Sequence, residues 1–168
     1  MGLRAGYQPT SAVRRSRRST RVKTGKPTYV LDTNVFLTFP DLLNRDLPGA
    51  RLVVPSAVHE EVAGTAHRQP RFAALVAAIT GAPERFEIRH DGPSLVRTYN
   101  GRMKGGDAAI LFVAKQLSNE GAAPVLVTED RDLIRAATAS GLAAATSVVL
   151  RNFSASRPIA ASELALLY

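Results

Sequence analysis

Four short acidic motifs recur along this chain, each where a buried strand is expected to end or a helix to begin. Their central acids are Asp32, Glu61, Asp107 and Asp130. Carboxylates about 4 Å apart repel one another by roughly 1 kcal/mol in water and about 4 kcal/mol at a protein surface. A fold that gathers them needs a compensating cation, and oxygen ligands suit Mg²⁺ or Mn²⁺. The motifs therefore predict metal-dependent phosphodiester chemistry.

The segments around these acids alternate between short apolar runs and helical patterns. This alternation predicts an α/β fold with three layers, α/β/α, around a central, mainly parallel sheet. In open sheets of this kind, sites lie beyond the carboxyl ends of the strands, so the four acids can face one cavity. The expected strands are 29–31, 52–54, 86–88, 125–128 and 143–150, and the main expected helices are 71–80, 107–119 and 130–140.

Each acid also has a purely structural interpretation. Asp32, Asp107 and Asp130 could cap helices, and Glu60 and Glu61 could belong to a solvated helix face. Taken together, the four acids favour a metal site over four separate structural roles, because they stand on separate elements at one expected edge of the sheet. We prefer Glu61 to Glu60 because it lies beside Val62, on the apolar side of its helix.

The positive charge of the chain is concentrated at its N-terminus. The residues before Asp32 contain eight basic side chains and no acid, which accounts for the whole net charge of +8. We expect 1–27 to be a basic, disordered arm, which either contacts nucleic acid or only aids solubility, and 28–168 to form one domain. The side chains expected to bind phosphates, with surface solvation as the alternative, are Arg14, Arg15, Arg17, Arg18, Arg102 and Lys104.

Composition excludes several other classes of protein. Cysteine is absent, so disulfides and thiolate metal sites are impossible. No apolar stretch approaches the ~20 residues that a membrane-spanning helix needs. We expect a cytoplasmic protein that does not contact membranes.

At the acidic motifs the sequence resembles the PIN domain, a family of metal-dependent ribonucleases. The matching segments are V-L-D-T-N ending at Asn34, P-x-x-V-x-E-E ending at Glu61, G-D-A-A-I-L ending at Leu111, and T-E-D-R-D ending at Asp132. In detail the chain looks most similar to the PIN domain of PhoH-like proteins. It contains no G-x-x-x-x-G-K-[ST] motif, so we expect no ATPase activity.

The resemblance implies roles for individual residues. The catalytic and metal-binding acids would be Asp32, Glu61, Asp107 and Asp130, with Mg²⁺ or Mn²⁺ as cofactor. Supporting polar groups would be Asn34, Thr128 and Asp132. The implied activity is endoribonuclease cleavage of RNA, and relatives of this type suggest a homodimer or an inhibitory protein partner.

Two other functions fit parts of the pattern. Leu31-Asp32 and Gly106-Asp107 superficially match a haloacid-dehalogenase-like phosphatase, although that chemistry needs an acid where Asn34 stands. A non-catalytic nucleic-acid-binding module with a PIN-like fold would also account for the basic arm.

Overall fold

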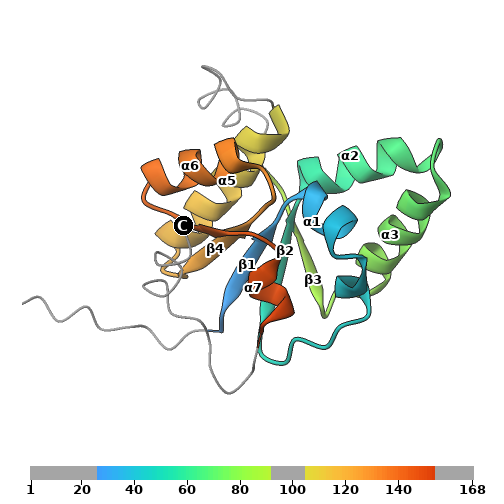
Figure 1. Ribbon diagram of the computed structural model, residues 1–168, viewed down its shortest axis with the longest axis horizontal. Helices are drawn as coiled ribbons and strands as arrows, with labels where there is room; N and C mark the ends of the chain where they lie inside the picture. The colour runs from blue at the N-terminus through green and yellow to red at the C-terminus, as the bar shows by residue number, and fades with distance from the viewer. Residues whose placement is uncertain (1–25, 92–104, 154–168) are drawn as a thin grey trace, which may run out of the picture.

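A computed structural model describes residues 26–91 and 105–153, which form one α/β unit (Figure 1). Five strands form an entirely parallel sheet in the order β3-β2-β1-β4-β5. The predicted three-layer α/β/α class is therefore confirmed. The strands are β1 Thr28–Leu31, β2 Arg51–Pro55, β3 Phe86–Arg89, β4 Pro124–Val127 and β5 Ala143–Ala145.

Helices connect the strands and cover the sheet. Figure 1 shows α2 and α3 grouped to one side of the strands, α5 and α6 to the other, and α7 in front of the sheet. The helices are α1 Thr33–Thr38, the 3₁₀ turn η1 Pro40–Leu43, α2 Ser56–Ala66, α3 Pro70–Gly81, α5 Gly105–Asn119, α6 Arg131–Ala139 and α7 Val148–Arg151. No helix in these described ranges is long and apolar enough to cross a membrane.

The strands β1 and β4 lie in the buried interior of the fold. All residues of β1 and β4 are buried, as expected for strands covered on both faces. Helix α5, which covers the sheet, buries Ile110, Leu111 and Leu117 along one side of the helix. This continuous core fixes the strand ends, where the acidic motifs lie.

The register of β1 and β4 brings two of those motifs side by side. Leu31 pairs with Val127, and the backbone N–H of Asp32 donates to the carbonyl of Val127 over 3.0 Å. On the other side, the N–H of Thr128 donates to Ala145 over 3.0 Å. Asp32 and Thr128 therefore leave the sheet together at its carboxyl edge.

Two local predictions were wrong. The expected last strand over 143–150 ends at Ala145, and the chain then turns into α7. Helix α5 begins at Gly105 rather than at Asp107. At the start of α2, Pro55 holds the N-cap position, and the Ser56 hydroxyl donates to Asp91.

Helix α6 ends at a glycine that the backbone requires. Gly141 has φ +75°, a left-handed conformation that other residues adopt at a cost. Its N–H donates to Thr138 and the next N–H, of Leu142, donates to Ala137, which satisfies the last carbonyls of the helix. A methyl group at Gly141 would meet nothing within 4 Å, so only the backbone opposes substitution.

We therefore expect Gly141→Ala to lower the free energy of unfolding by about 1 kcal/mol. The control is Gly64→Ala, because Gly64 lies inside α2 and also has open space around it. There alanine should stabilise the protein by about 0.5–1 kcal/mol. Urea denaturation of both variants measures the difference, and equal effects would contradict this account of the turn.

Candidate active site

Asp32 is the buried centre of the candidate site. It follows β1 directly, stands at the N-cap position of α1 and is only 6% exposed. Its carboxylate does not cap the helix. Instead, Oδ2 accepts hydrogen bonds from the Thr128 hydroxyl at 2.6 Å and from the Asn34 amide at 3.4 Å. The side chain is thus held by Thr128, which follows β4, and by Asn34 in α1.

Thr128 links the Asp32 carboxylate to Asp130, which stands at the start of α6. Its fully buried hydroxyl also accepts the backbone N–H of Asp130 over 3.0 Å. Asp130 then caps α6, because its Oδ1 accepts the N–H groups of Asp132 and Leu133 at 2.7 and 3.3 Å. The structural interpretation of Asp130 as a helix cap is therefore correct. The cap uses only Oδ1 of Asp130, and Oδ2 can still accept other bonds. A role of Asp130 in binding metal therefore stays a prediction.

Glu61 approaches the same edge from α2. Its Oε2 accepts the hydroxyl of Thr33 at 3.0 Å, and Thr33 is itself buried. The same oxygen lies 3.9 Å from the place where a Cβ on Gly106 would stand. The first turn of α5, which carries Asp107, therefore lies beside Glu61. A longer side chain at 106 would reach toward the Glu61 carboxylate.

Burial sets the electrostatics of Asp32. Desolvation raises the pKa of its carboxyl above the ordinary 3.8, and the charge of Glu61 raises it further. The hydrogen bonds from Thr128, from the Thr33 backbone and from Asn34 act in the opposite direction. The net shift is upward, so the fold holds a carboxylate whose charge is only partly compensated.

The structure brings Asp32 and Glu61 near each other, but it does not gather the four predicted acids into a closed cage. Across residues 26–91 and 105–153, no three acidic or histidine side chains come close enough to hold a metal ion among themselves. Asp130 is engaged with α6, and Glu61 is exposed. The donor set nevertheless fits Mg²⁺, since it consists of oxygens, and Mg²⁺ usually takes only one or two carboxylates together with water and substrate phosphates.

Other predicted residues lie farther from this arrangement or outside the described part. The carboxylate of Asp132 is 87% exposed and pairs with Arg135 at 2.6 Å, so the structure gives it a surface position on α6. Its supporting role stays a prediction. The expected phosphate-binding side chains Arg14, Arg15, Arg17, Arg18, Arg102 and Lys104 all fall outside the described residues, as does nearly all of the arm over 1–27.

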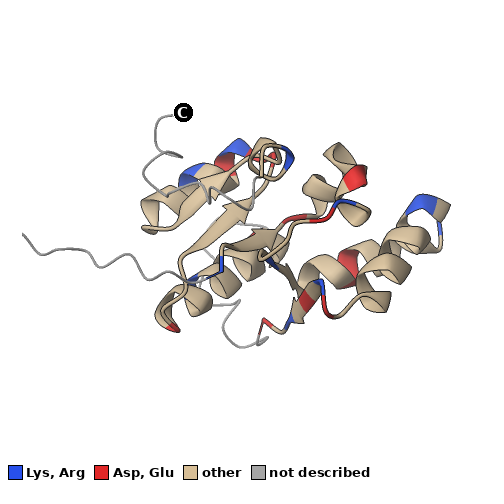
Figure 2. Ribbon diagram, turned by 90° about the horizontal axis from the view of Figure 1, so that it is seen from below, with Lys and Arg blue, Asp and Glu red and all other residues tan. Residues whose placement is uncertain are grey.

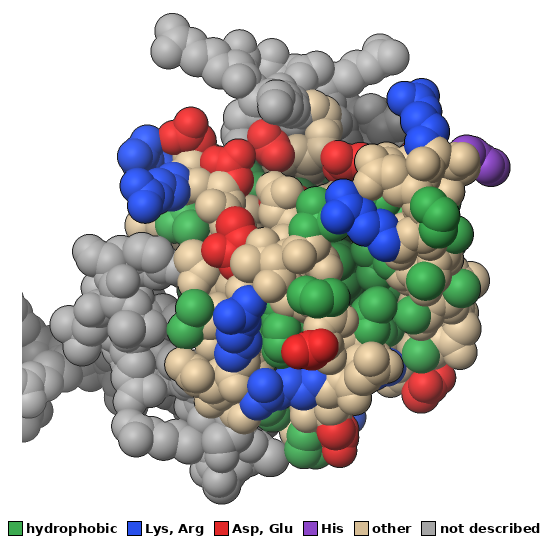
Figure 3. Space-filling view, turned by 45° about the vertical axis from the view of Figure 1, so that its right-hand side comes forward, with side chains coloured by type: hydrophobic (Ala, Val, Ile, Leu, Met, Phe, Trp, Pro, Cys, Tyr) green, Lys and Arg blue, Asp and Glu red, His purple; other side chains and the backbone are tan. Residues whose placement is uncertain are grey.

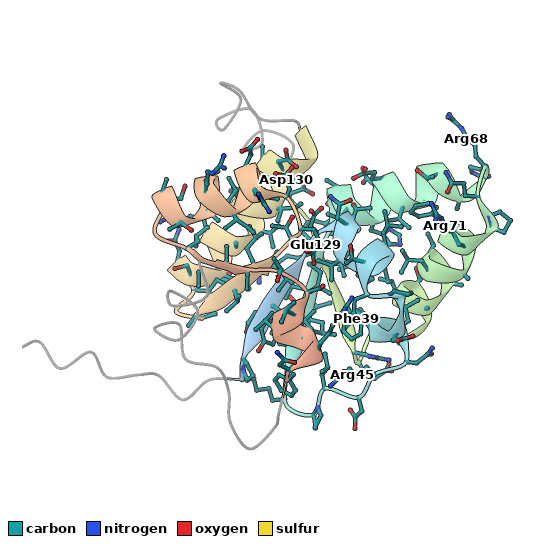
Figure 4. All side chains as sticks on the ribbon, viewed as in Figure 1. Phe39, Arg45, Arg68, Arg71, Glu129 and Asp130 are labelled. Carbon is teal, nitrogen blue, oxygen red and sulfur yellow. The ribbon has the colours of Figure 1, made fainter. Side chains whose placement is uncertain are left out.

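Two contributors escaped the sequence analysis. Thr33 orients Glu61, and Glu129 accepts the N–H of Ser147 at 2.8 Å, which ties the start of α7 to the acidic edge (Figure 4). The position of Thr33 between Asp32 and Asn34 was a usable signal. The partner of Glu129 was not, because it lies eighteen residues away, in a segment expected to be a strand.

The family model described as "PIN domain" matches residues 29–148, which is most of the chain. The chain belongs to the PIN domain family. This confirms the resemblance, and the family is one of nucleases that generally use divalent metal ions. No curated protein sequence matches this PIN domain. The special likeness to PhoH-like proteins stays a prediction.

Two solved structures share the fold of this PIN domain. One is VapBC-1 from nontypeable Haemophilus influenzae, with 18% identity, a TM-score of 0.50 and coverage of 72% of this chain and 98% of that chain. The other is the PIN domain of RRP44 from T. brucei, with 20% identity, a TM-score of 0.52 and coverage of 77% of each chain. At these identities the likeness concerns the fold alone.

We expect Asp32→Asn to raise the stability of the PIN domain at neutral pH. The raised pKa means that the unfolded chain releases the Asp32 proton at lower pH than the folded chain. Folding stability therefore falls as pH rises from the ordinary pKa to the folded one, and the loss persists above it. Thermal unfolding at pH 3 to 8 should show the advantage of the variant growing with pH and then levelling off. A constant difference would contradict the pKa argument.

We expect Thr128→Val to destabilise the fold by about 1–3 kcal/mol. Valine keeps the shape but removes the donor to Asp32 and the acceptor for the Asp130 N–H. Thr138→Val is the control, because Thr138 is exposed on α6 and bonds only within its own helix. The control should change stability by less than about 0.5 kcal/mol in the same denaturation experiment.

Proposed function

We propose that this PIN domain is an endoribonuclease that hydrolyses RNA phosphodiester bonds with Mg²⁺ or Mn²⁺. The observation that carries the proposal is the buried Asp32 carboxylate, held at the edge where β1 and β4 end and facing a second acid, Glu61. Desolvating a charged group disfavours folding, so a fold that keeps this pair has a use for it. Membership of a nuclease family supports the same activity.

Asp32 and Glu61 would hold the metal ion, with Asp107 and Asp130 as the further predicted ligands. When bound, a divalent ion supplies Lewis-acid stabilisation of the charge that develops on the phosphate. The chain's own residues do the positioning. Thr128 and Asn34 hold Oδ2 of Asp32, and Thr33 holds Oε2 of Glu61. These bonds favour one orientation of each carboxylate, so less ordering is needed when substrate arrives.

The structure also bears on the phosphatase alternative. That chemistry needs a general acid two residues after the nucleophile, and the residue there is Asn34, whose amide donates to Asp32. An amide neither releases nor takes up a proton at physiological pH. We therefore prefer phosphodiester hydrolysis to a phosphomonoester reaction that proceeds through an aspartyl intermediate.

Cleavage of a fluorescently labelled single-stranded RNA tests the proposal. We expect wild-type cleavage with Mg²⁺ or Mn²⁺, no cleavage with EDTA, and a fall of at least about 10²-fold for Asp32→Asn and Glu61→Gln. Glu60→Gln is the matched control, since Glu60 is the exposed neighbour of Glu61 on α2 and should retain activity. Cleavage that survives EDTA, or equal losses at 60 and 61, would overturn the metal role.

Metal binding has a readout separate from activity. Mg²⁺ or Mn²⁺ should raise the melting temperature of the wild-type domain, because a ligand that binds only the folded state stabilises it. The rise should vanish in Asp32→Asn. A chain that shows neither metal stabilisation nor cleavage would instead be the non-catalytic binding module. An RNA substrate, a homodimer, an inhibitory protein partner and a cytoplasmic location remain parts of this proposal.

A further inference from the structure

Two arginines on the face below the acidic edge share one aromatic ring. The guanidinium carbons of Arg45 and Arg151 lie 5.9 and 5.2 Å from the centroid of Phe39, which is 5% exposed. Arg45 donates to the carbonyl of Arg151 at 2.6 Å, and Arg151 donates to Thr38 at 2.7 Å. Since each guanidinium has five N–H donors, most of the donors in the pair remain available.

Neither arginine of the pair forms an ion pair with an acid of the described structure. The ion pairs within residues 26–91 and 105–153 involve Arg51, Arg89 and Arg135, and neither Arg45 nor Arg151 takes part in one. Arg151 is exposed and Arg45 half-buried. Two cations anchored on one ring repel each other, and a bound anion would relieve that repulsion. Guanidinium groups fixed in this way suit phosphate, which they can bind with paired hydrogen bonds.

Two short helices connect this pair to the acidic edge. Helix α1 starts beside Asp32 and ends at Thr38, which is about 9 Å of helix. Helix α7 starts after Ser147, whose N–H is bound by Glu129, and ends at Arg151. Both helices therefore begin at the candidate active site and end at the arginines. In Figure 4, Phe39 and Arg45 lie below Glu129 on the same side of the molecule.

The same two helices carry the exposed large hydrophobic residues of the described structure. These are Leu37 on α1, 42% exposed, and Val148 on α7, 50% exposed. Figure 3 shows acidic side chains along the upper part of this face with basic ones among them, hydrophobic side chains in its middle, and basic side chains lower down with acidic ones beside them. Apolar side chains can contact the faces of unstacked bases, while the arginines take the backbone.

We propose that Arg45, Arg151, Leu37 and Val148 form a track for single-stranded RNA that leads into the active site. The arginine pair would bind a phosphate several nucleotides from the scissile bond, and the two apolar side chains would contact the intervening bases. The inference rests on the proposed function and adds a binding surface outside the acidic edge, which only a strand longer than a dinucleotide would reach. The complementarity between cationic arginines and anionic phosphates favours RNA over a protein segment as the occupant.

Binding measurements in the cleavage-deficient Asp32→Asn background, with EDTA, test this without depending on catalysis. The probe is a labelled single-stranded RNA of about 12 nucleotides, within the range that such proteins cover. We expect Arg45→Gln/Arg151→Gln to raise Kd on the order of tenfold. It should also reduce the slope of log K against log salt by about 0.7, because the pair binds one phosphate and each phosphate contact on a single strand contributes about that much.

The matched control is Arg68→Gln/Arg71→Gln. It removes the same charge near the turn between α2 and α3. Arg68 lies in this turn, and Arg71, at the start of α3, also sits on an aromatic ring, that of Phe72, 5.1 Å away. Figure 2 shows the basic residues of this turn at the opposite end of the molecule from α6. Its Kd should change less than about twofold. Equal weakening in both double variants would mean that only net charge matters, and would overturn the track.

A second variant covers the case in which removing the arginines disturbs the fold. Leu37→Ser/Val148→Ser changes two exposed side chains, and we expect it to raise Kd several-fold with an unchanged salt slope. If it instead alters the oligomeric state in light scattering while Kd stays the same, the apolar pair belongs to a protein interface and the proposal fails. Failure of the proposed function would appear separately, as absence of metal-dependent cleavage by the wild-type chain.

Discussion

The hydrogen bond between the Thr128 hydroxyl and the Asp32 carboxylate is the contact around which the site is organised. It forms because β1 and β4 are parallel neighbours whose last paired residues are Leu31 and Val127. Parallel strands present their carboxyl ends at one edge, so two segments almost a hundred residues apart meet there. The same hydroxyl accepts the Asp130 N–H, so one buried side chain joins Asp32 to the start of α6.

This arrangement places a stability cost where the chemistry is proposed. Burial of Asp32 and the nearby charge of Glu61 both disfavour the ionised carboxyl, and three hydrogen bonds only partly offset them. A core position with that balance would ordinarily be occupied by an apolar residue. The cost is understandable if a bound cation compensates the charge, and burial beside a like charge is a common cause of shifted pKa values at functional sites.

Two arginines gather at one place away from the candidate site. Asp32 and Glu61 lie at the carboxyl edge of the sheet, whereas Arg45 and Arg151 lie around Phe39 at the far ends of α1 and α7. Because α1 and α7 start near the acids and end near the arginines, the lengths of these helices set the distance between the two groups. In the proposed function, a polyanionic strand would meet the carboxylates and the guanidinium groups along a single face.

The sequence by itself determined the parallel α/β class, the order of the motifs and the placement of Asp32 and Thr128 at the ends of strands, because apolar runs and the polar residues after them are local signals. Tertiary structure decided what each polar group does. Asp130 caps α6, Asp132 pairs with Arg135 at the surface, and Thr33 holds Glu61. It also made 148–151 a helix, which no residue spacing indicated, and put Arg151 beside Phe39. The partner of each side chain depends on which segments pack together in space. The periodicity of apolar residues along one segment carries no information about which other segments pack against it.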